Sequence, residues 1–155
     1  MTSQVITRLQ ALGLSVPQVV APVASYVPAV RTGSLVFTAG QLPFVDGQLP
    51  ATGRLGAEVG VEQGADLARI CALNAIAAVG TVVDDLDDIV RVVKVVGFVA
   101  STPDFFDQPT VVNGASDLLI AAFGESGRHA RSAVGMAVLP RNAPVEVELV
   151  VEVRT

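Results

Sequence analysis

The sequence is poor in the side chains that most often bind nucleic acids and metal ions. It has no tryptophan, one tyrosine (Tyr26), one lysine (Lys94) and one histidine (His129). Nucleic-acid-binding domains usually combine a basic surface with stacking aromatic residues, whereas this chain has a formal net charge of −5. A single histidine also excludes every metal site that needs several histidine ligands. The composition therefore argues against a nucleic-acid partner and against a metal cofactor of that kind.

Cysteine is equally scarce, and charged residues are few. With Cys71 as the only cysteine, no disulfide can form within the chain. Cys71 lies beside the alanines of a predicted helix, which favours a buried, unreactive thiol over a nucleophile. Charged residues make up 16% of the sequence, against about 25% in an average soluble domain. Disordered chains are rich in charge and poor in apolar residues, so disorder is excluded.

No segment is long and apolar enough to predict a membrane span, although the mean hydropathy of +0.58 is high. The most apolar stretch, residues 89–100, contains Arg91 and Lys94 and is shorter than the roughly 20 residues that a spanning helix needs. The N-terminus, MTSQVITRLQ, lacks the apolar core of a signal peptide. We therefore expect a cytoplasmic protein without a membrane partner, whose surplus apolar residues lie at a subunit interface.

The 155 residues fit a single folding unit with one core. Apolar residues at helical spacing predict helices, and β-branched runs bounded by Gly and Pro predict strands. The resulting order is ββαβαββ, which indicates an α+β sandwich with two helices on one face of a sheet. The predicted helices are 4–12, 61–83 and 109–123, and the predicted strands are 26–31, 35–40, 89–100, 130–139 and 145–153.

The last two strands are predicted to form a hairpin. Bulky apolar side chains occupy even positions in the first strand and odd positions in the second, so burying them together pairs Val138 with Val147. Arg131 and Glu146 then share the opposite face, with about eight residues or roughly 26 Å between them along the hairpin. This register predicts that the two side chains cannot meet within one chain.

Arg131 is the strongest candidate for chemistry. It opens a strand among Ala130, Ser132 and Ala133, and such small neighbours leave room for a guanidinium that could hold a carboxylate by two hydrogen bonds. A structural ion pair with a glutamate is an equally good interpretation. No Gly-x-Ser-x-Gly elbow or Gly-rich phosphate loop is present, and His129 is expected to be a surface residue rather than a catalytic base.

Three ordered segments carry a more specific pattern: TAGQLP (38–43), VVNGAS (111–116) and ARSAVGMAVLPRNAPVEVE (130–148). Together they resemble the RidA (YjgF) family of reactive-intermediate deaminases. The resemblance implies a chorismate-mutase-like ββαβαββ fold with a mixed sheet, assembled as a homotrimer with sites in the clefts between subunits. It extends over about residues 22–153, so we expect an N-terminal helix and arm over 1–20 and a RidA-like domain over 21–155, as in a longer branch of the family.

The resemblance also implies an activity: hydrolysis of 2-imino acids and their enamine tautomers, such as 2-aminoacrylate, to 2-keto acids and ammonia without a cofactor. Carried over by position, Arg131 would bind the substrate carboxylate and Glu146 would position water. Two positions depart from the compact members of the family: Ser116 stands where they have an aromatic residue, and Ala133 stands where they have a cysteine. The residues that would bind the rest of the substrate are Tyr26, Gly40, Asn113 and Ala133.

Two other functions remain open at the level of the sequence. One is a non-catalytic trimer that binds small carboxylates resembling 2-keto acids. The other is the ribonuclease activity attributed to some relatives, which the acidic charge of the chain disfavours because it would repel a phosphate backbone.

Overall fold

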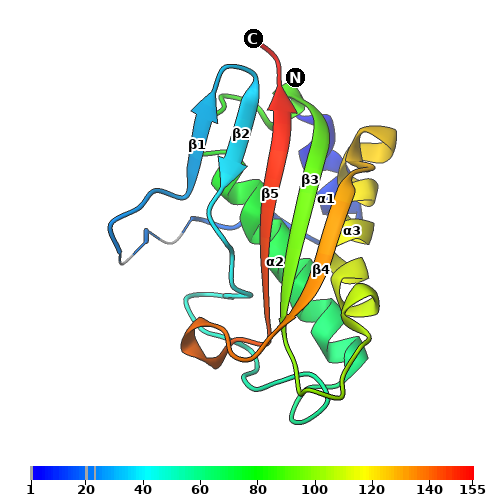
Figure 1. Cartoon of the computed structure of the whole chain (residues 1–155). Helices are drawn as coiled ribbons and strands as arrows, with labels where there is room; N and C mark the ends of the chain where they lie inside the picture. The colour runs from blue at the N-terminus through cyan, green and yellow to red at the C-terminus, as the bar shows by residue number, and fades with distance from the viewer. Residues whose placement is uncertain (1, 20, 23) are drawn as a thin grey trace.

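A computed structural model describes residues 2–19, 21–22 and 24–155 and shows a five-stranded mixed sheet with its helices on one side (Figure 1). The strand order is β1-β2-β5-β3-β4, in which only the β3–β4 pair is parallel. This confirms the predicted fold class. The elements are α1 (Gln4–Ala11), β1 (Ala29–Thr32), β2 (Leu35–Thr38), α2 (Val61–Val79), β3 (Ile89–Ala100), α3 (Gln108–Phe123), β4 (Ala130–Met136) and β5 (Val145–Val153), with short 3-10 turns η1 (Leu86–Asp88), η2 (Gly124–Gly127) and η3 (Pro140–Asn142).

The elements follow the sequence patterns closely. β3 and β5 have the predicted bounds, whereas α2 ends at Val79 and β4 ends at Met136, each a few residues earlier than predicted. The expected boundary after residue 20 adjoins Val20, which lies outside the described residues.

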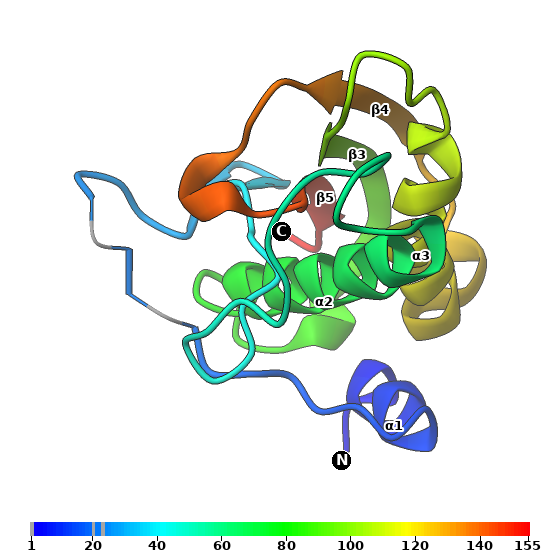
Figure 2. The same ribbon diagram turned by 90° about the horizontal axis from the view of Figure 1, so that it is seen from below.

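The core lies between the sheet and the layer formed by α2 and α3. Every odd residue of β5 is buried against this layer. Most alanines of α2, among them Ala72 and Ala75, are fully buried, because small side chains let the helix pack closely on the sheet. Figure 2 shows α1 on the side of α2 and α3 that faces away from the sheet, so the N-terminal helix adds a third layer.

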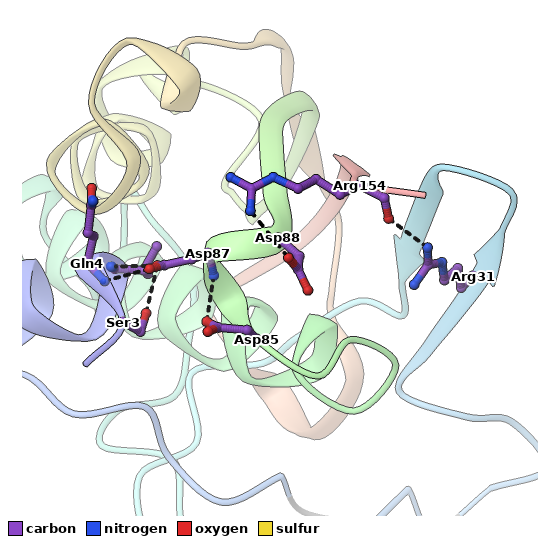
Figure 3. A network of polar contacts seen from close by, with 8 residues as sticks. Ser3, Gln4, Arg31, Asp85, Asp87, Asp88 and Arg154 are labelled. Carbon is purple, nitrogen blue, oxygen red and sulfur yellow. Dashed lines mark hydrogen bonds and ion pairs between the residues drawn. The ribbon is translucent and has the colours of Figure 1, made fainter. Parts of the chain in front are cut away.

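Helix α1 is fixed to η1 by one carboxylate. Asp87 accepts hydrogen bonds from the backbone N–H groups of Gln4 (2.8 Å) and Val5 (3.1 Å) and from the hydroxyl of Ser3 (2.7 Å) (Figure 3). These bonds, above all the one from the Gln4 N–H, lower the pKa of Asp87. Because the first N–H groups of a helix have no partner inside it, a carboxylate at this position caps the helix and complements its dipole.

The predicted hairpin between the last two strands is wrong. β4 and β5 lie on opposite sides of β3: Val134 of β4 and Glu146 of β5 both pair with Phe98. The segment β3–α3–β4 forms a crossover unit, and such a unit places its second strand parallel to the first. β4 therefore takes the free side of β3 and becomes an edge strand.

The predicted burial of β4 is also inverted. Val134 and Met136 are exposed on the face of the sheet opposite the helices, while Ala133 and Gly135 face α3. The bulkier side chains of β4 do not face the core, because α3 lies so close to β4 that only small residues fit beneath it. The helix-free face consequently carries exposed apolar side chains on β1, β2 and β4: Val30, Phe37, Val134 and Met136.

Within the described part of the chain, no helix has both the length and the apolar character needed to cross a membrane.

Candidate functional site

Arg131 lies on β4 and extends across the helix-covered face towards α3. Its Nη1 donates to Oδ1 of Asn113 (2.8 Å) and to Oγ of Ser116 (3.2 Å), and its Nη2 donates to the carbonyl oxygen of Pro109 (3.2 Å). The structure thus brings together Arg131 and Asn113, two of the residues selected from the sequence. Ala133, two residues further on the same face of β4, belongs to the same cluster, which we call the arginine cluster.

The close approach of α3 to the sheet makes these bonds possible. Gly97 of β3 pairs with Ala133, and a Cβ atom at Gly97 would collide with the side chain of Val112 on α3. A glycine facing a helix in this way lets the two backbones approach. The neighbouring residue Asn113 and the next helical turn, which holds Ser116, then come within reach of Arg131.

The ion pair that the sequence left open for Arg131 is absent among the described residues. The salt bridges of this part of the chain join Arg128 to Glu125 and Arg154 to Asp88. A guanidinium has five N–H donors, of which Nη1 uses both and Nη2 one. Nε and one N–H of Nη2 have no hydrogen-bond partner among the described residues, and a guanidinium can receive a carboxylate through such nitrogens.

His129 is not the surface residue expected from the sequence. It is partly buried, with Nε2 2.9 Å from Oγ of Ser116 and Nδ1 2.6 Å from the carbonyl oxygen of Gly127. The sequence alone does not indicate Ser116 and His129 as site residues, because their contact depends on how α3 packs against the start of β4. The available signal was the serine three positions after Asn113, on the same helical face.

A second group of selected residues lies elsewhere, around Glu146 of β5. A Cβ atom at Gly40 would overlap the Glu146 carboxylate, so this close contact requires glycine at position 40. The segment after β2 is fixed here by paired backbone bonds between Gln41 and Val147 (2.8 and 3.0 Å). Burial and, to a smaller extent, the neighbouring Glu148 raise the pKa of Glu146, since both disfavour its charged form.

Tyr26 extends this second group into a cavity of about 890 Å³ between α2 and the N-terminal arm. Tyr26 and Gly40 both line the cavity, and Asn74 of α2 supports its floor by donating to the carbonyl oxygens of Leu42 (3.0 Å) and Phe44 (3.1 Å). The Tyr26 side chain is 56% exposed. We call Tyr26, Gly40 and Glu146 the glutamate cluster.

The two clusters do not meet within the chain. Arg131 pairs with Val95, while Glu146 pairs with Phe98 three residues further along β3, a rise of roughly 10 Å. The predicted separation of 26 Å along a hairpin is therefore wrong. The prediction that both side chains share a sheet face is also wrong, because Arg131 faces α3 and Glu146 lies on the helix-free face. The conclusion that one chain cannot unite them holds for this different reason.

Other reactive groups offer no competing site in the described segments. No cluster of three or more His, Cys, Asp or Glu side chains there could hold a metal ion. Cys71 is fully buried as predicted, and burial, assisted by the charge of Glu146, raises the pKa of its thiol well above the ordinary value. A thiol in that state has little thiolate to act as nucleophile.

Comparison with known proteins agrees with the motifs. Residues 6–153 match the family described as "YjgF/chorismate mutase-like, putative endoribonuclease". Protein TCP17 of Trypanosoma cruzi is 45% identical over 97% of this chain and 95% of its own length. The crystal structure of Atu1372 from Agrobacterium tumefaciens, a protein of unknown function, superposes with a TM-score of 0.92 at 44% identity, covering 97% of this chain and 93% of the other.

A more distant solved relative carries a ligand. Escherichia coli TdcF, crystallised with bound serine, superposes with a TM-score of 0.64 at 26% identity over 89% of this chain and 94% of its own. The higher similarity to TCP17 and Atu1372 places this chain on their branch rather than beside TdcF. The chain belongs to the YjgF/chorismate mutase-like (RidA) family, as its motifs indicated.

Proposed function

We propose that this protein hydrolyses small 2-imino acids to 2-keto acids and ammonia. The observation that carries the proposal is Arg131, whose guanidinium is fixed by Asn113, Ser116 and Pro109 while a pair of N–H groups stays free of any carboxylate among the described residues. Such a pair recognises the carboxylate that imino and keto acids share. The serine bound to TdcF carries the same group, which supports a carboxylate ligand here.

In the proposed reaction, water attacks the imine carbon to give a carbinolamine, which collapses to the keto acid and releases ammonia. Glu146 would orient the water and take its proton. Its raised pKa suits this task, because a base accepts a proton most effectively when its pKa lies close to the working pH. The reaction needs no cofactor, since the imine is already activated towards water, and the backbone groups of Gly40 and Ala133 would hold the reacting end.

The complete site would form between subunits of a homotrimer, because Arg131 and Glu146 lie on opposite faces of one sheet. The helix-free face supports such an assembly, since exposed apolar side chains on a sheet face favour burial against a partner. Strand β4 lies at the edge of the sheet, so the backbone groups on its outer side pair with no strand of the described residues. A neighbouring subunit would then bring its Glu146, Gly40 and Tyr26 to this edge.

Keto-acid release from imino acids generated in situ by an amino-acid oxidase tests the proposal directly. The wild type should accelerate release of keto acid and ammonia, and Arg131→Lys should lose most of this activity because lysine keeps the charge but not the two-point geometry. Arg131→Ala with undiminished activity would refute the assignment.

A non-catalytic carboxylate-binding trimer is the second candidate, and the same free N–H pair of Arg131 supports it. Binding of pyruvate by a wild type that accelerates no imine hydrolysis would favour this candidate. Ribonuclease activity receives no support from a chain of net charge −5.

A further inference from the structure

A chain of hydrogen bonds through Ser116 and His129 supports the guanidinium of Arg131. Neither residue takes part in the chemical steps of the proposed reaction. Nη1 of Arg131 lies 3.2 Å from Oγ of Ser116. Ser116 Oγ lies 2.9 Å from Nε2 of His129, whose Nδ1 lies 2.6 Å from the carbonyl oxygen of Gly127. Ser116 is one of the few buried polar residues of the described chain, at 9% exposure.

With a neutral imidazole, the chemistry of the four groups gives one consistent direction for each bond. A carbonyl oxygen only accepts, so Nδ1 of His129 carries a hydrogen and donates it to Gly127. In the neutral imidazole Nε2 is then an acceptor, and Ser116 must turn its hydroxyl hydrogen towards it. The lone pairs of Ser116 Oγ consequently face Arg131, whose Nη1 can only donate. No member of the chain is left in conflict with its neighbour.

The chain is anchored on rigid backbone at its far end. A Cβ atom at Gly127 would overlap the carbonyl group of Leu119, so η2 packs directly on the α3 backbone and the Gly127 carbonyl has a fixed place. Ser116 projects from the same helix, one turn after Asn113. Helix α3 therefore supplies both groups that take the hydrogens of Nη1, and His129 locks one of them.

We propose that Ser116 and His129 are positioning residues for carboxylate binding. By holding both N–H groups of Nη1, Ser116 and Asn113 turn the other edge of the guanidinium, formed by Nε and Nη2, towards the ligand. His129 acts through Ser116, because it sets the hydroxyl so that only lone pairs face Arg131. This inference rests on the proposed function, in which Arg131 binds the carboxylate of the substrate.

The expected effect is selective for binding. Ser116→Ala removes one hydrogen bond to the guanidinium, which should raise KM for a small imino acid roughly 3- to 10-fold. The kcat value should stay within about twofold of wild type, because the carboxylate is bound equally in ground and transition states. His129→Phe should raise KM about as much as Ser116→Ala does. Ser116→Thr keeps the hydroxyl, so its KM should stay close to the wild-type value.

The test measures four quantities on the whole chain: KM and kcat with an oxidase-generated imino acid, the affinity for pyruvate by calorimetry, and the melting temperature. Ser126→Ala serves as the matched control, since no described residue hydrogen-bonds to the Ser126 side chain and it lies in the turn before His129. A double variant completes the set. Ser116→Ala in the Arg131→Lys background should leave KM and pyruvate affinity as they are in Arg131→Lys alone, because the guanidinium that Ser116 positions is no longer present.

The outcomes separate this inference from the proposed function. If the wild type is active and Ser116→Ala and His129→Phe match Ser126→Ala in KM and pyruvate affinity, the positioning role is refuted while the deaminase proposal stands. A lower melting temperature with unchanged pyruvate affinity would likewise refute it, because the two residues would then be structural only. A wild type that neither binds pyruvate nor hydrolyses imines would overturn the proposed function and this inference with it.

Discussion

Replacing Asp87 by asparagine should loosen the docking of α1 on the rest of the fold. The substitution keeps the size of the side chain but removes the charge and leaves one oxygen where two now accept from Ser3, Gln4 and Val5. Loss of an N-capping acceptor costs about 0.5–2 kcal/mol, and the lost attraction between a charge and the helix dipole costs about 0.3–1 kcal/mol. Because these terms overlap and Asp87 is partly exposed to solvent, we expect about 1–2 kcal/mol.

Hydrogen exchange of the α1 amides is the assay of choice, since the helix can detach before the sheet unfolds. The amides of Thr7 and Leu9 should exchange roughly 5- to 30-fold faster in Asp87→Asn, and those of β5 should change less. Asp84→Asn is the matched control, because Asp84 lies in the same acidic loop but its carboxylate accepts no hydrogen bond from a described residue. Equal exchange in both variants would refute the capping role.

The same contact predicts a dependence of α1 docking on pH. Hydrogen bonding, first from the Gln4 N–H, lowers the folded-state pKa of Asp87, so its contribution is fully present above the unfolded value of about 3.9. The contribution is lost as the pH falls through the folded pKa. The difference in α1 protection between wild type and Asp87→Asn should therefore be constant near neutral pH and shrink below about pH 4. A difference that stays unchanged at pH 3 would contradict this explanation.

Three further changes test the site and its assembly. Gly40→Ala would force the Glu146 carboxylate aside, and since that flexible end can move cheaply, imine hydrolysis should fall at least about tenfold while the melting temperature changes by less than about 4 °C. Val134→Glu places a charge on the helix-free face and should convert a trimer into monomers by light scattering, so an unchanged mass would disprove the role of this face. Gly97→Ala should destabilise the fold by about 1–3 kcal/mol in urea unfolding, because the new methyl group meets Val112.

The course of the elements could be predicted from the sequence because each depends on local patterns. The run of β-branched residues in β3 and the alternation in β5 gave the correct bounds of both strands, since burial on one or both faces leaves a direct trace in the sequence. The end of α1 is likewise marked by Gly13, which adopts the positive φ of 74° that follows a helix.

Strand pairing and the orientation of β4 could not be predicted in the same way. A short connection between two strands suggests a hairpin. Here the connection between β4 and β5 passes β3, which lies between them, and no local sequence pattern indicates that intervening strand. The prediction of a surface position for His129 is wrong for a related reason. The neighbours of His129 in sequence are charged or small, and its hydrogen-bond partner Ser116 lies on a helix whose position depends on Gly97 and Gly127.

The unusual composition of β4 has one physical origin and two consequences. Its inward positions carry Ala133 and Gly135 because α3 lies close, and this same closeness brings Asn113 to Arg131. Bulky apolar residues are left to the outward positions, where Val134 is exposed in the single chain. If the bulky side chains of β4 faced inward, more surface would be buried within one subunit. They would also push α3 away, and the Arg131 guanidinium would lose its hydrogen-bond acceptors on that helix. Placement of Arg131, the proposed carboxylate-binding residue, and exposure of the apolar face proposed for assembly are therefore coupled, so enlarging Ala133 should weaken carboxylate binding even where the sheet still forms.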